Sequence, residues 1–158
     1  YYYLRLSYCY LAQPILYKEH IFENISSSGN FLSFFFVSAA VYSLQSFLNA
    51  PVWLLMIILL AAAVLIVYQM MWTNKINNKR QYFYILIICM VLIEAGWAIS
   101  FLPVNYNIAG LVLAIYYYML GGLAKLYLLG SLSGKSVKIY LIFGFLGITL
   151  VLLTARWV

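Results

Sequence analysis

The stretch VWLLMIILLAAAVLIV, residues 52–67, contains no charged side chain and no alternation of apolar and polar positions. Strands of a membrane β-barrel alternate with a period of two, whereas a continuously apolar run is typical of a helix in a membrane. Because a helix rises about 1.5 Å per residue, about 20 residues cross the hydrocarbon core of a bilayer, which is about 30 Å thick. With its flanks, residues 51–72, the stretch predicts one complete membrane span.

The composition of the whole chain agrees with this interpretation. Of its 158 residues, 67% are hydrophobic and only 8% are charged, and the mean hydropathy is +1.00. A soluble domain is about 25% charged. These values exclude a soluble globular enzyme, a disordered chain and an ordinary DNA-binding module. We therefore expect an all-α fold, a polytopic integral membrane helical bundle.

Four further apolar stretches have the length of a span, and short connections between them make neighbouring helices antiparallel. We expect the polar run 26–30 to open the first span and Asn107 to cap the fourth. Residues 29–158 are predicted to form the bundle. Residues 1–28 are predicted to be either a short interfacial segment or the tail of an upstream span. The predicted spans are residues 31–49, 51–72, 82–102, 108–130 and 137–157.

Basic residues are concentrated on one side of this predicted bundle. The loops 73–81 and 131–136, with the residues next to them, carry lysine and arginine, and the other two connections carry no charge. Under the positive-inside rule, both basic loops and the N-terminal segment are cytoplasmic and the C-terminus is outside. The basic residues in question are Lys75, Lys79, Arg80, Lys135 and Lys138.

The residue types that most enzymes need are scarce. The chain has one histidine, His20, three glutamates and no aspartate, and no Gly-rich phosphate loop is present. Glu19, His20 and Glu23 are too few for a carboxylate-bridged metal site in a bundle. We therefore expect no catalytic residues, no cofactor and no metal. The net charge of +6 indicates attraction to membrane lipids, because three basic residues in one loop make no phosphate track for nucleic acid.

Glu94 is the one carboxylate inside a predicted span, where a charge costs at least about 2.5 kcal/mol. Tyr42 and Gln45 of the first span, and the tyrosine run 116–118 of the fourth, fall at the same predicted depth. We expect these residues to form a buried polar cluster. One interpretation is a site for a proton, an ion or a polar ligand, and the other is a set of hydrogen bonds that fixes helix register. The candidate site residues are Glu94, Tyr42, Gln45, Tyr116, Tyr117 and Tyr118.

A row of small residues at four-residue spacing runs along the fourth span: Gly110, Ala114, Gly122 and Gly130. Small residues let helix backbones approach closely in a bilayer. The row predicts a packing seam, either within the chain or with a second copy or another membrane subunit.

The sequence therefore favours a non-enzymatic integral membrane subunit or scaffold that associates through helix–helix contacts. The alternative is a transporter or channel for a small solute, a proton or an ion, which would use a buried Glu94.

The predicted orientation can be tested by labelling. In a variant without Cys9 and Cys89, single cysteines at Asn77 and Asn105 should differ in their reaction with a membrane-impermeant reagent in sealed cells, because their loops lie on opposite sides. Equal labelling at both positions would contradict the predicted topology.

Overall fold

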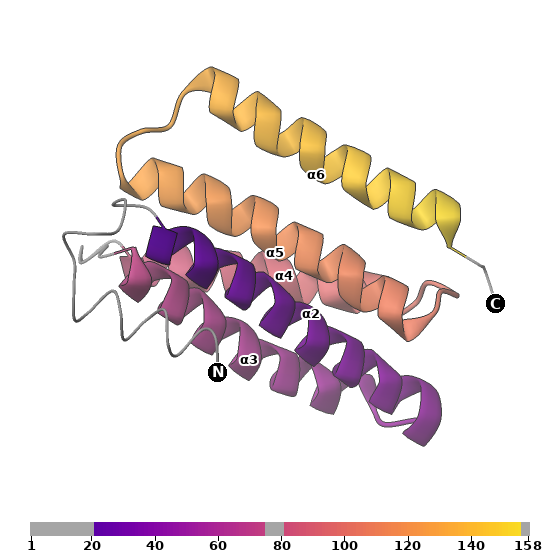
Figure 1. The fold of residues 1–158 in the computed structure, drawn as a ribbon. Coiled ribbons are helices and arrows are strands. Elements are labelled where there is room, and N and C mark those ends of the chain that lie inside the picture. The colour runs from indigo at the N-terminus through magenta and orange to yellow at the C-terminus, as the bar shows by residue number, and fades with distance from the viewer. Residues whose placement is uncertain (1–20, 75–80, 156–158) are drawn as a thin grey trace.

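The computed structural model describes residues 21–74 and 81–155, which form five long helices (Figure 1). Each of the five is long and apolar enough to cross a membrane. The expected all-α bundle with five such helices is thus confirmed. The helices are α2 (Ile21–Leu48), α3 (Val52–Thr73), α4 (Gln81–Ile99), α5 (Tyr106–Leu128) and α6 (Gly134–Thr154).

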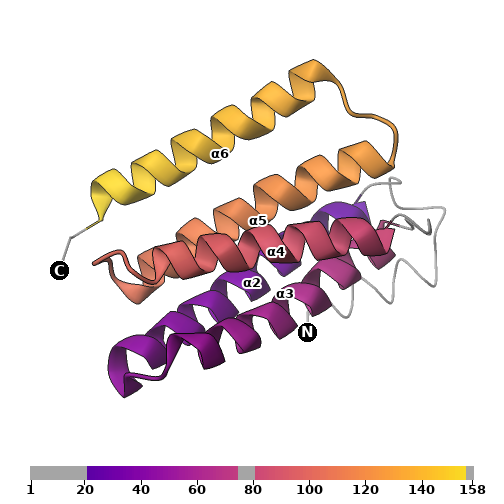
Figure 2. The same cartoon turned by 180° about the vertical axis from the view of Figure 1, so that it is seen from behind.

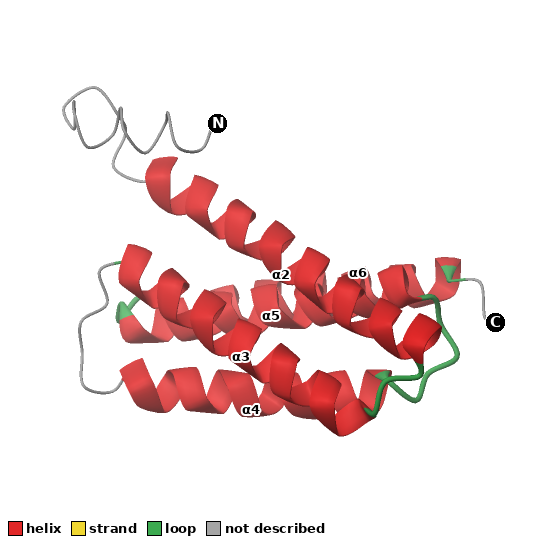
Figure 3. Ribbon diagram, turned by 90° about the horizontal axis from the view of Figure 1, so that it is seen from below, coloured by secondary structure: helices red, strands yellow, loops and turns green. Residues whose placement is uncertain are grey.

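Four of the helices form a packed core, and the fifth lies to one side. α2 packs against α3 and α5, and α4 packs against the same two helices. α6 contacts only α5 among the described helices, and it lies at the edge of the bundle in both Figure 1 and Figure 2. Figure 3 shows that α2 is inclined relative to α4. The arrangement leaves most of α6 exposed, and Gly144 is its one buried residue.

The prediction for the start of the first helix was wrong. The helix begins at Ile21, so the polar run 26–30 lies inside it rather than before it. Ser26 and Asn30 are both buried, and the Ser26 hydroxyl donates to the Thr73 hydroxyl of α3 at 3.3 Å. Packing against a neighbour therefore overrides the weak helix preference of serine, glycine and asparagine. The described part of the predicted interfacial segment, residues 21–28, belongs to α2, and residues 1–20 lie outside the described residues.

The other helix ends differ from the predictions by a few residues, and side-chain hydrogen bonds explain the starts of α5 and α6. The side chain of Asn105, not that of Asn107, caps α5, because the Asn105 side-chain oxygen Oδ1 accepts from the Asn107 backbone N–H at 3.1 Å. The Ser133 hydroxyl likewise accepts from the backbone N–H of Ser136 and starts α6 three residues earlier than expected. The turn from α2 to α3 places Asn49 at φ 48°, in the left-handed region that asparagine tolerates.

The core consists of apolar side chains on one face of each inner helix. On α3, Leu59, Ala63 and Val67 are spaced by four residues and are fully buried. On α5, Leu113 and Ala114 are also fully buried. Both helices are apolar on their outer faces as well, which is typical of a helix surrounded by apolar solvent.

Gly110 of α5 lies directly against the backbone of α2. A Cβ atom added to Gly110 would lie 2.7 Å from the backbone nitrogen of Ala39 and 2.9 Å from its Cα. Both residues are buried. Backbone cannot move aside as a flexible side chain can, so only glycine fits at this position.

The predicted row of small residues does not form one seam. Gly110 faces α2, whereas Gly122 faces the ring of Tyr140 on α6. Gly130 contacts nothing within 4 Å of an added Cβ and has φ 68°, so it ends the helix instead of packing. Ala114 is fully buried in the core. A four-residue spacing drifts around a helix of 3.6 residues per turn, so distant members of the row face different neighbours.

Gly110→Ala should lower the free energy of unfolding by about 1–3 kcal/mol, because overpacking forces α2 and α5 apart. Gly147→Ala is the matched control on α6, since its Cβ would meet only the Ile115 side chain at 3.6 Å, an ordinary contact. Thermal melts in detergent measure both variants. Equal melting temperatures would contradict the close approach of α2 and α5.

Candidate functional site

Tyr42 and Gln45, two of the predicted site residues, lie together and connect α2 to the end of α4. The buried Tyr42 hydroxyl donates to the backbone carbonyl of Gly96 at 2.9 Å. The Gln45 side-chain nitrogen donates to the carbonyl of Ser100 at 3.4 Å. These contacts satisfy two polar side chains on backbone oxygens, which is a common role for polar groups between packed helices.

A cleft of about 280 Å³ lies beside these two side chains, at the end of the bundle where α4 meets α5. Gln45 and Ser46 of α2, Asn49 in the turn after it and Ser100 after α4 contribute polar groups. Tyr106 and Ala109 of α5 also line the cleft. The described lining has no carboxylate, imidazole or amine, and its titratable groups are the phenols of Tyr42 and Tyr106.

Glu94 does not join this cluster, and its predicted place in the interior was wrong. The residue is exposed on the outer face of α4. It makes no hydrogen bond or ion pair within the part of the chain that the structure describes. The inner face of α4 carries Leu92 and Gly96, and each lies two residues, or about 200°, from Glu94 around the helix. The prediction matched residues by depth, but depth does not determine the face.

Trp97, one turn further along the same face, is also exposed and packs edge-on against Phe101 at 5.4 Å between ring centres. Trp97 therefore lies on the outer face of α4, as Glu94 does. The outer face of α4 is otherwise apolar, with Met90 and Val91 exposed one turn before Glu94.

The three tyrosines of the run 116–118 point in three directions, because consecutive residues on a helix are about 100° apart. Tyr117 is buried and stacks on Phe34 of α2, with ring centres 4.8 Å apart. Tyr118 is half exposed and packs edge-on to Phe31 at 6.1 Å. Tyr116 lines a separate groove between α5 and α6. Of the residues expected in the buried polar cluster, only Tyr42 and Gln45 therefore lie together.

A second set of buried polar residues, not predicted from the sequence, lies at the opposite end of the bundle. Ser26 and Asn30 of α2 are buried there, as is Gln81 at the start of α4. The Asn30 side-chain nitrogen is buried without a hydrogen-bond partner among the described residues. The four-residue spacing of Ser26 and Asn30 was the available signal, since it places both on one helix face.

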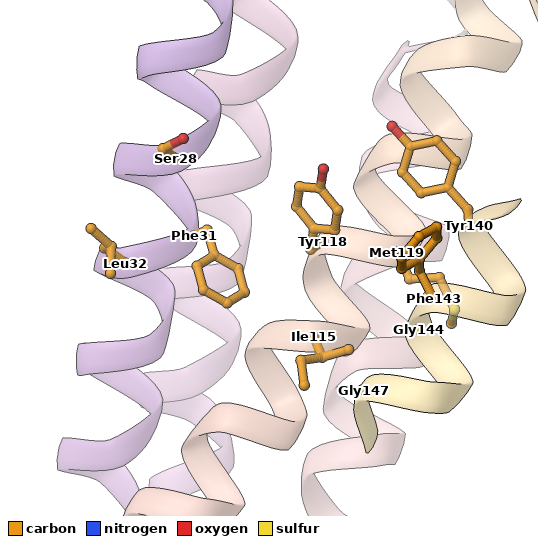
Figure 4. A pocket seen from close by; sticks show the side chains of 10 residues that line it. All are labelled: Ser28, Phe31, Leu32, Ile115, Tyr118, Met119, Tyr140, Phe143, Gly144 and Gly147. Atoms are coloured by element: carbon orange, nitrogen blue, oxygen red, sulfur yellow. The ribbon is translucent and has the colours of Figure 1, made fainter. Parts of the chain in front are cut away.

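A cleft of about 410 Å³ between α2, α5 and α6 was likewise not predicted from the sequence (Figure 4). Ten residues line it, most of them apolar, and Gly144 and Gly147 of α6 form part of its wall. The cleft exists because α2 and α6 both pack on α5 but not on each other. The glycines of the last helix were the feature of the sequence that could have indicated this cleft.

Metal or cofactor ligands are not gathered anywhere in the described ranges, where no three His, Cys, Asp or Glu side chains lie together. Cys89 is buried in the core as a free thiol. The candidates Glu19 and His20 lie outside the described residues, and nothing is described of the Glu23 side chain.

Tyr42→Phe should lower the free energy of unfolding by about 0.5–1.5 kcal/mol, because it removes the hydrogen bond to the Gly96 carbonyl and keeps the ring. Tyr82→Phe, on an exposed ring of α4, is the matched control and should leave stability unchanged. Thermal melts of both variants in detergent measure the difference. A Tyr42→Phe variant as stable as the parent would mean that this hydrogen bond does not connect α2 to α4.

Comparison with known proteins shows the family of the chain. A family model described as a protein of unknown function, DUF5656, matches residues 29–154. No curated protein and no solved structure matches the chain. The matched range covers the greater part of α2 and all of α3 to α6. The chain therefore belongs to the DUF5656 family.

Proposed function

We propose that the protein is a non-enzymatic integral membrane subunit, which associates with other membrane helices through the outer face of α4. Five helices that are long and apolar enough to cross a membrane support the membrane placement. The distribution of basic residues supports an orientation with the 73–81 and 131–136 loops in the cytoplasm.

The exposure of Glu94 is the observation that carries this proposal. Glu94 is five residues from Ile99, the last residue of α4, so it lies about 7 Å from that helix end. In a bilayer this position is inside the hydrocarbon, where a carboxyl without a partner costs several kcal/mol. A neighbouring helix that offers a hydroxyl, an amide or a basic side chain at the same depth removes this cost.

The surroundings of Glu94 fit such a contact. The exposed residues around it are large and apolar, and Ala98, one turn beyond, is small and exposed. Small residues allow close helix approach, and a polar group beside them gives specificity to the pairing. A second copy of this chain and another membrane protein are both possible partners for this face.

The alternative prediction was a transporter or channel that uses a buried Glu94. It depends on a carboxyl inside the bundle. The carboxyl is outside the bundle, and the inner face of α4 presents apolar side chains such as Ile88 and Leu92 to the core. We therefore propose the subunit alone.

A photo-reactive phenylalanine analogue at Met90, beside Glu94, should crosslink to one protein partner in intact membranes. The same analogue at Ile57, exposed on α3, is the control and should not do so. Glu94→Leu should abolish the crosslink, and Val91→Leu, an apolar change on the same face, should keep it. An adduct of twice the chain mass identifies a second copy.

The same variant separates association from folding. Because Glu94 is exposed, Glu94→Leu should change the stability of the purified chain by no more than about 0.5 kcal/mol. Equal crosslinking from Met90 and Ile57, or a crosslink that survives Glu94→Leu, would contradict the proposal.

A further inference from the structure

The cleft between α2, α5 and α6 has the size and the lining of a binding site. Its volume of about 410 Å³ lies within the range of roughly 300–1,000 Å³ that is usual for small-molecule pockets. Phe31 and Leu32 of α2 form one wall, and Phe143 of α6 forms the other. Ile115 and Met119 of α5 lie between them (Figure 4). An apolar ligand is therefore the class that this cleft fits.

One end of the cleft is polar. In Figure 4 the hydroxyls of Tyr118 and Tyr140 both point toward the end of the bundle where α6 begins, and Ser28 lies toward the same end. The two tyrosine rings are 6.0 Å apart between centres. The ring of Tyr140 lies directly against Gly122, where an added Cβ would clash with it. The cleft is thus amphipathic along its length.

Positive charge lies beyond the hydroxyls, at the same end. Lys125 is two helical turns past Tyr118 on the same face of α5, about 10 Å further along the helix. Lys135 and Lys138 are in the first turns of α6. Basic residues outnumber acidic ones nine to three in the whole chain. A ligand with an apolar tail and an anionic head matches this order of groups.

We propose that the cleft binds an acyl chain of an anionic phospholipid, whose phosphate lies near the tyrosine hydroxyls and the lysines. The inference rests on the membrane placement in the proposed function, and it concerns a different face from Glu94. The phospholipid belongs to the leaflet on the side of the basic loops. In the proposed orientation of the chain this is the cytoplasmic leaflet, which carries the anionic lipids.

A transmembrane helix of a partner fits the cleft less well. A helix with its side chains is a rigid cylinder about 10–12 Å across, whereas the cleft between α2 and α6 has a volume of about 410 Å³. A flexible acyl chain is narrow enough to enter between α2 and α6. The amphipathic order of the lining also matches a lipid, whose polar end is fixed at the headgroup.

Native mass spectrometry of the full chain in detergent tests this proposal. Phosphatidylglycerol and phosphatidylcholine with identical acyl chains are the two probes. The anionic lipid should bind about tenfold more tightly, since each nearby lysine contributes about fivefold at most. Glycerol 3-phosphate, which has the phosphate without the chains, should not bind. Equal binding of the two lipids, or binding of glycerol 3-phosphate, would overturn the proposal.

Two variants of α6 locate the site. Gly147→Leu should fill the cleft and lower phosphatidylglycerol binding by about tenfold or more. Leu146→Phe is the matched control, because residue 146 lines the groove on the other side of α6. Joint replacement of Tyr118 and Tyr140 by phenylalanine should reduce the preference for the anionic lipid and keep the binding of phosphatidylcholine.

Melting temperatures show that each variant is folded. A folded Gly147→Leu variant that binds phosphatidylglycerol like the parent would contradict the site. A photo-crosslink from Phe143 to a protein in membranes, and none to lipid, would assign the cleft to a partner helix and overturn the proposal. Because the crosslinking test at Met90 reports on α4, the lipid site and the subunit role can each fail alone.

Discussion

The contact between Gly110 and the backbone of Ala39 sets the geometry on which the other packing contacts depend. It brings α5 against α2 more closely than any side chain larger than hydrogen would allow. In a bilayer, apolar surface has no preference for protein over lipid, so close packing and hydrogen bonds must hold helices together. With α2 and α5 in contact, Tyr117 stacks on Phe34 two turns further along. The hydroxyl of Tyr42 also reaches the Gly96 carbonyl across the core.

The outlying position of α6 has a structural consequence of its own. The helix packs on α5 through small residues, with Gly144 against Met119 and Gly122 against Tyr140. Because it has no second neighbour among the described helices, a cleft opens between it and α2. A helix that was packed on both α2 and α5 would close this space. The packing of α6 on α5 alone therefore leaves α6 exposed. It also forms the amphipathic cleft to which we assign a phospholipid.

Glu94 and the cleft lie on different parts of the surface, and each is the basis of a proposed interaction outside the chain. Glu94 is a polar group on an apolar face, for which we propose a partner with a complementary group. The cleft is an apolar space with a polar end, which fits a lipid. Neither feature resembles a catalytic centre, because neither brings a nucleophile, a base and a donor together within the described residues.

The sequence by itself determined the number and type of the helices in the described part of the chain, and it placed most of their ends within a few residues. Continuous apolar runs of about 20 residues have one stable form in a bilayer, and turn residues such as Pro51 and Pro103 mark the breaks. Only the tertiary structure decided which face of each helix is inside. A soluble helix shows its inner face by its apolar stripe, but α3 and α4 are apolar on most of their outer faces as well. The sequence therefore placed Glu94 within α4 but on the wrong side of that helix. The cleft beside α6 could not be predicted from the sequence either. A gap between helices depends on how the helices pack and not on the residue pattern within any one of them.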